Sequence, residues 1–147
     1  MTSSTTRSDI ELAARLRPAV IRTARRLRQE AGTDLSPSLA TALATIERHG
    51  PLTPSGLAEI ERVRRPTATR MVARLEEEGL VLRTTDPHDG RVSLVSTSPA
   101  GRTLLKKVRG RKTAYLARRL RELSDEEAAD LERAAAILER LLEEERA

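Results

Sequence analysis

The chain has 147 residues, a formal net charge of +5 and no cysteine, so it fits one domain and excludes disulfides, thiolate nucleophiles and cysteine-ligated zinc. Tyr115 is its only aromatic residue, so any core must be built from aliphatic side chains. No stretch approaches the roughly 18 apolar residues of a membrane helix, and the first residues lack the apolar segment of a signal peptide, so we expect a cytoplasmic protein with no membrane partner.

The first predicted element is a helix that begins with Ser8 or Asp9 as N-cap and ends near Gly32. Its apolar residues recur at helical spacing and form one stripe: Leu12, Leu16, Val20, Ala24 and Leu27. Pro18 lies inside this pattern. Because proline removes a backbone donor and crowds the preceding turn, we expect it to kink the helix or split it.

Three later helices are predicted from a shared start signal, a hydroxyl N-cap followed by proline, at 36–37, 53–54 and 98–99. The first of them ends at Gly50, which suits a left-handed C-terminal cap. The second runs from 54 to about 61.

A further helix is predicted from Arg65-Pro66 to Gly79. Its buried face follows the spacing of an amphipathic helix and consists of Ala68, Met71, Val72 and Leu75. The opposite face, directed to solvent, carries Arg65, Thr67, Thr69, Arg70 and Arg74.

Beyond Gly79 the pattern changes to two strand-like runs, 80–85 and 91–97, separated by the turn-forming sequence DPHDG. This pattern predicts a β-hairpin. Two long helices follow, about 99–123 and 125–145, and Ser124 with Glu127 forms a capping box at the start of the second.

The order of these elements, two closely joined helices followed by a hairpin, predicts a winged helix-turn-helix. The second helix, with its arginines and threonines, suits the major groove of double-stranded DNA. Charge supports this, since residues 62–112 hold 13 Lys and Arg against 5 Asp and Glu, whereas residues 122–147 hold 3 against 10. A plain solvated helix face is the alternative explanation of the arginines.

The hairpin tip, 86–91, combines a tight turn with a projecting cation, Arg91. A cation placed there can enter a narrow minor groove or hold a phosphate. Asp89 should not touch phosphates, so we expect it to orient Arg91 or to cap the turn. An ordinary charged hairpin turn is the alternative.

No enzyme chemistry is indicated. His49 and His88 stand far apart without metal-ligand spacing, and the sequence has no P-loop, dinucleotide-binding glycine pattern or nucleophile elbow. We therefore expect no catalytic residues, no metal and no cofactor.

Three motifs resemble the MarR (multiple antibiotic resistance regulator) family, and the resemblance extends over nearly the whole chain. They are the L-T-x-x-x-L-A pattern at 52–58, the run 69–83 with its E-x-x-G-L-V-x-R ending, and D-P-x-D-G-R at 86–91. The resemblance implies a mainly α fold with a small β-hairpin wing and about six helices. It also implies an obligate two-fold homodimer through the first and last helices, acting as a transcription regulator, with repression favoured over activation.

On this basis the chain divides into a dimerisation helix, 8–34, a DNA-binding lobe, 35–98, and C-terminal dimerisation helices, 99–147. The predicted DNA contacts come from the recognition helix, about 66–79, and the wing, 84–93, and are Arg64, Arg65, Thr67, Thr69, Arg70, Arg74, His88, Asp89 and Arg91. The predicted dimer contacts are Leu12, Leu131, Ala135, Leu138, Leu141 and Leu142.

Two positions depart from the family pattern. His88 stands where many relatives carry arginine, and Arg65 stands where a small N-cap is usual. The first should reduce attraction to the minor groove at neutral pH, and the second should add a cation near the phosphates.

Relatives also sense small aromatic or phenolic effectors between the dimerisation helices and the DNA-binding lobe. The candidate lining residues are Leu16, Val20, Leu43, Leu57 and Tyr115, for which simple core packing is the favoured explanation. Two alternative functions stay open: a winged-helix module that binds protein or RNA, and a non-specific architectural DNA-binding protein without effector control.

Overall fold

The computed structural model describes residues 2–144, and in that range it contains six helices and one two-stranded antiparallel sheet. In chain order the elements are α1 (Thr2–Glu30), α2 (Pro37–His49), α3 (Pro54–Glu61), α4 (Arg65–Glu77), β1 (Val81–Thr85), β2 (Ser93–Thr97), α5 (Pro99–Leu120) and α6 (Asp125–Glu144). The predicted mainly α fold with a hairpin wing is confirmed.

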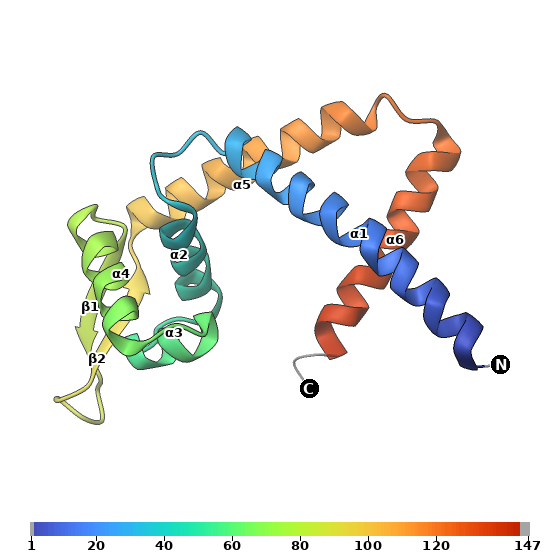
Figure 1. Cartoon of the computed structure of the whole chain (residues 1–147). Helices are drawn as coiled ribbons and strands as arrows, with labels where there is room; N and C mark the ends of the chain where they lie inside the picture. Colours follow the sequence, from blue (N-terminus) through green and yellow to red (C-terminus); the bar gives the residue numbers. More distant parts are fainter. Residues whose placement is uncertain (1, 145–147) are drawn as a thin grey trace.

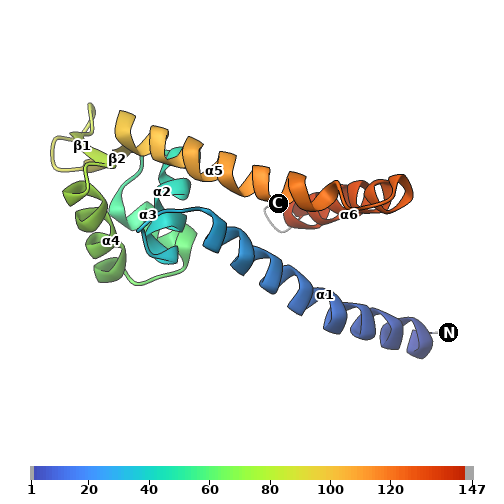
Figure 2. The ribbon, with the colours of Figure 1, turned by 90° about the horizontal axis from the view of Figure 1, so that it is seen from above.

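The chain has a lobe at one end and long helices at the other. Figures 1 and 2 show α2, α3, α4 and the hairpin gathered in the lobe, from which α5 extends away. The C-terminal end of α1 reaches the lobe and α1 packs against α5, while α6 begins at the far end of α5. This arrangement separates the predicted recognition helix from the predicted dimer helices.

The core lies in the lobe and is aliphatic, as the composition requires. Its largest fully buried side chains come from α2, α3, α4 and the hairpin: Leu43, Ile46, Leu57, Val72, Leu75, Val81 and Val95. By contrast, α6 has no buried residue along its described length. Most of the apolar side chains that are buried within the single chain therefore lie in the lobe, where they hold α4 and the wing in position.

The base of the wing is tied to its neighbours on both sides. Leu52 forms a two-way backbone bridge with Val95, with N to O distances of 3.0 and 2.7 Å. Ser98 donates from Oγ to the Gly79 carbonyl at 2.6 Å and accepts from the Gly101 N–H at 3.0 Å. The start of α5 is thereby joined to the turn between α4 and β1.

The predicted helix starts are confirmed. Ser36, Thr53 and Ser98 each cap a helix, and each side-chain oxygen accepts from the backbone N–H three residues on. The capping box is also present: Ser124 and Glu127 exchange hydrogen bonds of 3.1 and 3.2 Å at the start of α6.

The prediction for the start of the first helix is wrong, because α1 begins at Thr2 and passes through Ser8 and Asp9 without a cap. Both side chains are exposed to water. They therefore need not hydrogen-bond the backbone, which is the interaction by which Ser and Asp compete with a helix. The helix is also not split at Pro18 and runs on to Glu30 (Figure 1). Residues around Pro18 are mostly exposed, so water can satisfy the carbonyl that loses its partner.

Two further local predictions need correction. Gly50 is not left-handed: its φ of −65° and ψ of 163° are extended, which is the region that a following proline imposes. Glycine is required there for another reason, because a Cβ would collide with the Ile46 carbonyl oxygen. The N-cap of α4 is Arg64 rather than Arg65, and α5 ends at Leu120 rather than near 123.

Candidate nucleic-acid interface

The two faces of α4 differ in the way that the sequence predicted. Ala68, Val72 and Leu75 are fully buried against the lobe. The opposite face carries the predicted contacts: Arg65, Thr69, Arg70 and Arg74 are exposed and Thr67 is partly buried. The helix thus presents a cationic and hydroxyl-bearing surface that the lobe holds from behind.

The start of α4 is also cationic. Arg64 caps the helix without a side-chain hydrogen bond, and the first turn contains no acidic residue. Free backbone N–H groups and the positive end of the helix dipole add to the charges of Arg64 and Arg65. An anion at this end of the helix would meet a favourable field.

Arg62, between α3 and α4, was not singled out by the sequence. Its φ is 54°, the one positive φ of a non-glycine residue in residues 2–144, and it closes the turn of the helix-turn-helix. The Val63 N–H donates to the Ala58 carbonyl at 3.0 Å across this turn. No sequence signal marks the position, since a glycine or asparagine is the usual residue there.

The arginines of α4 differ in their partners. The guanidinium of Arg70 donates to the Thr67 hydroxyl at 3.5 Å. Within residues 2–144 it forms no ion pair with an Asp or Glu. Arg74 lies 3.3 Å from Glu77 and 3.7 Å from Glu78. Exposed pairs of this kind contribute about 0 to 1 kcal/mol, so Arg74 can exchange them for a phosphate at small cost.

The wing loop is ordered by two aspartates. Asp86 Oδ1 accepts from the backbone N–H of His88 at 2.7 Å and of Asp89 at 3.3 Å. Asp89 Oδ1 accepts from the Arg91 backbone N–H at 3.0 Å and from its Nε at 3.3 Å. Asp89 therefore both caps the turn and orients Arg91, whose side chain is 93% exposed.

One ion pair that the sequence did not indicate joins the wing to α4. Glu76 Oε2 lies 3.0 Å from Arg83 Nε, which connects the last turn of α4 with β1. The two residues are seven apart with a turn between them, a spacing that no helix or hairpin rule connects. The pair helps to fix the wing relative to the exposed face of α4.

The five predicted pocket residues do not come together. Leu43 and Leu57 are fully buried in the core, and Leu16 and Val20 on α1 are 41% and 47% exposed. Tyr115 lies beside Arg26 of α1, whose Cζ is 5.3 Å from the ring centroid.

Arg26 is held in place by that contact. Its Nε donates to the Tyr115 hydroxyl at 3.3 Å, and this hydrogen bond, with the charge of Glu30, raises the pKa of the guanidinium. The pair links α1 to α5, and neither residue lines the cavity between α1, α2 and α5.

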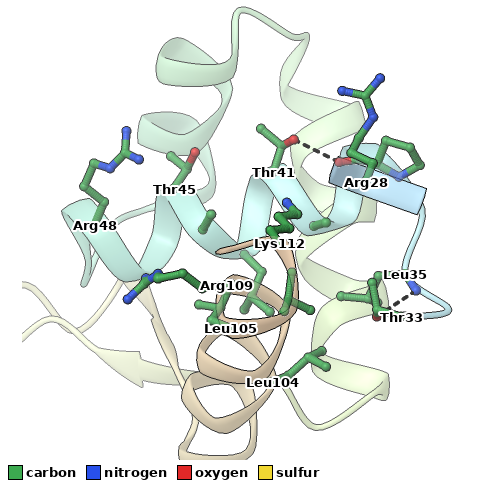
Figure 3. A pocket seen from close by; sticks show the side chains of 15 residues that line it. Arg28, Thr33, Leu35, Thr41, Thr45, Arg48, Leu104, Leu105, Arg109 and Lys112 are labelled. Carbon is green, nitrogen blue, oxygen red and sulfur yellow. Dashed lines mark hydrogen bonds between the residues drawn. The ribbon is translucent and has the colours of Figure 1, made fainter. Parts of the chain in front are cut away.

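A different cavity, of about 370 Å³, lies between the end of α1, α2 and α5 (Figure 3). Among the predicted residues only Leu43 contributes to its wall. The remaining lining mixes apolar residues with Arg and Lys, a combination that the helical spacing of apolar residues does not indicate.

The predicted dimer contacts are largely solvent-exposed in the single chain. Leu12, Leu131, Leu141 and Leu142 are between 50% and 64% exposed, Ala135 is exposed and Leu138 is partly buried. They form apolar surface on α1 and α6 that the chain itself leaves uncovered.

Within residues 2–144, no group of three or more His, Cys, Asp or Glu side chains is gathered as a metal site would require. The same part of the chain has no helix with the length and hydropathy needed to span a bilayer. His49 and His88 are both exposed.

Comparison with known proteins matches residues 35–93 to the MarR family model. An HTH-type transcriptional regulator of Mycobacterium tuberculosis is 41% identical over 138 residues, which cover 93% of this chain and 96% of that protein. The Bacillus subtilis HTH-type transcriptional repressor MdtR is 33% identical over 93 residues, 63% of this chain and 60% of that protein.

Solved structures share the fold. A MarR family protein from Bacillus stearothermophilus superposes with a TM-score of 0.80 at 28% identity, covering 93% of this chain and 96% of that one. Streptococcus pneumoniae FabT, solved in complex with DNA, superposes with a TM-score of 0.64 at 22% identity, covering 95% of this chain and 98% of that one.

Proposed function

The chain belongs to the MarR family of transcriptional regulators, and from this premise we propose that it binds a near-palindromic double-stranded DNA operator as a homodimer and acts as a repressor. The observation that carries the proposal is the pairing of the exposed cationic face of α4 with an oriented, exposed Arg91 on the wing. In this arrangement α4 enters the major groove and the wing reaches the minor groove.

The proposed contacts fall into two groups. Arg65, Thr67, Thr69 and Arg70, on the exposed face of α4, read base edges. Arg64, Arg74, His88 and Arg91 neutralise phosphates or the minor groove, and Asp89 acts through Arg91.

The exposed apolar surface of α1 and α6 supports the proposed two-fold pairing. A single chain that leaves leucines such as Leu141 and Leu142 in water gains by covering them with a second copy. In the proposed division of labour, 8–34 and 99–147 pair the chains while 35–98 binds DNA. Two lobes related by the two-fold axis then face successive turns of an inverted-repeat operator.

Repression is the simplest output of such a dimer, because a protein that covers a promoter blocks polymerase without needing another surface. The relative MdtR is named a repressor. We further propose that a small-molecule effector controls DNA binding through the cavity between α1, α2 and α5, since it lies where the dimer helices meet the lobe.

The test is selection of bound duplexes from a random pool, followed by affinity measurements on the selected and a scrambled duplex. Arg70→Ala should remove most of the preference for the selected duplex, whereas Arg74→Ala should weaken both duplexes alike. Lys107, exposed on α5, provides the control, and Lys107→Ala should change neither. Equal affinity of the unchanged protein for both duplexes would refute specific regulation and leave the architectural alternative.

A further inference from the structure

The cavity between α1, α2 and α5 is lined by cations that make no ion pair within residues 2–144. Arg28, Arg48, Arg109 and Lys112 contribute to its wall, and none of its lining residues is an Asp or Glu. Among the described residues none of these four side chains makes an ion pair. Unpaired like charges around one hollow repel each other, so an anion bound there would be stabilised by the cations nearest to it.

The floor of the cavity is apolar. It consists of Leu35, Pro37, Ala40, Leu43, Ala44, Leu104, Leu105 and Val108. No aromatic side chain is among the lining residues, so a ligand ring would find none to stack on.

Two of the three threonine hydroxyls on the wall already donate to groups of the chain, whereas the Thr33 hydroxyl accepts from the Leu35 backbone N–H at 3.2 Å. Thr41 donates to the Pro37 carbonyl at 2.9 Å, and buried Thr45 donates to the Glu61 carboxylate. Charged recognition of a ligand therefore falls to the Arg and Lys side chains, and the Thr33 hydroxyl can add a neutral donor.

The cations are divided between the two ends of the cavity. Figure 3 shows Arg28 at the end near the start of α2 and Arg48 near its other end, with Lys112 and Arg109 of α5 between them. Thr41 and Arg48 lie on one face of α2 seven residues apart, which places their backbones roughly 10 Å apart along the axis. A ligand with one charge would satisfy only one end.

We propose that the ligand of this cavity is an elongated organic dianion, with an anionic group at each end and an apolar middle. One anionic group binds Arg28 and Lys112, and the other binds Arg48 and Arg109. The apolar middle covers the leucines of α5. This inference rests on the proposed effector control and gives that effector its chemistry, in place of the aromatic or phenolic molecule expected from the family resemblance.

Such a ligand would connect the two functional parts of the chain. Arg28 belongs to α1, on the dimer side, whereas Arg48 belongs to α2 in the lobe. A dianion that bridges them ties the lobe to α1 and α5 in one orientation. The spacing of the two α4 helices in the dimer, and with it the affinity for the operator, then depends on the ligand.

The test is calorimetric titration of the full chain with suberate, whose two carboxylates are separated by a flexible apolar chain. Octanoate has the same chain length with one carboxylate, and 4-hydroxybenzoate represents a phenolic anion. Suberate should bind on the order of tenfold more tightly than either, because the second charged contact is worth that much. Arg28→Ala and Arg48→Ala should each reduce suberate affinity to that of octanoate, while Lys107→Ala should not.

Three results would overturn the proposal: no suberate binding up to millimolar concentration, octanoate or 4-hydroxybenzoate binding as well as suberate, or an equal loss in the Lys107→Ala control. DNA affinity measured on the same samples separates this inference from the proposed function. Specific DNA binding without suberate binding would refute the dianion alone. Suberate binding without specific DNA binding would refute the operator and retain the ligand site.

Discussion

Replacing Arg62 separates the backbone strain of the helix-turn-helix from its charge. A left-handed conformation costs a non-glycine residue about 1 to 2 kcal/mol, and Arg62 adopts one with φ of 54°. Glycine removes this cost but loses about 0.5 to 1 kcal/mol through the greater freedom of the unfolded chain. The net gain for Arg62→Gly is therefore about 0 to 1.5 kcal/mol with a midpoint of about 0.75 kcal/mol, and that midpoint corresponds to a rise in Tm of roughly 2 to 3 °C.

Arg62→Ala is the matched control, because alanine keeps the left-handed strain and removes the same charge. We expect thermal unfolding followed by circular dichroism to give Arg62→Gly a higher Tm than Arg62→Ala. Both variants remove the same positive charge, so their DNA affinities should be equal to each other. All samples are compared at one concentration, since the Tm of a dimer depends on it. If glycine melts no higher than alanine, the strain at this turn is not real.

Three further predictions concern the wing, its base and the dimer. Arg91→Ala should weaken DNA binding without lowering Tm, and Asp89→Ala should weaken it less when Arg91 is already removed; additive losses would separate the two residues. Gly101→Ala should lower the free energy of unfolding by about 1 to 3 kcal/mol in urea titration, because the added Cβ collides with the Leu80 carbonyl oxygen; an unchanged midpoint would contradict this. Truncation after Ala134 should give monomer or aggregate in sedimentation and abolish binding to paired half-sites; a monomer with full operator affinity would exclude the proposed dimer.

The elements that the sequence predicted well are those whose signals are local. Ser36, Thr53 and Ser98 act on their own first turns, and the buried face of α4 follows from a repeat of three and four residues. The aspartates of the wing also act within six residues of each other, so Asp89 was assigned to Arg91 without knowledge of the fold. Such contacts depend only on residues that are close in the sequence, and not on how the rest of the chain folds.

The features that the sequence did not reveal depend on where distant segments meet. Gly50 is different, because Pro51 directly after it favours extended backbone and so argues against a left-handed cap from the sequence alone. Glu76 and Arg83 meet because a turn reverses the chain between them. The surroundings of the predicted pocket residues also depend on the path of the chain, since Leu57 is fully buried in the core whereas Leu16 on α1 is 41% exposed.

The distribution of positive charge is the property for which the sequence-based prediction and the structure differ most. The excess of Lys and Arg in residues 62–112 was interpreted as one DNA-binding surface. In the structure these cations lie in two places. Arg65, Arg70 and Arg91 lie on α4 and the wing, whereas Arg109 and Lys112 line the cavity between α1, α2 and α5. Counting charged residues along the sequence cannot separate the two groups, because the count does not show the direction in which each side chain points. Under the two proposals made above, this charge serves two anion-binding surfaces, one for a duplex and one for a small molecule, and the helices between them would couple the two.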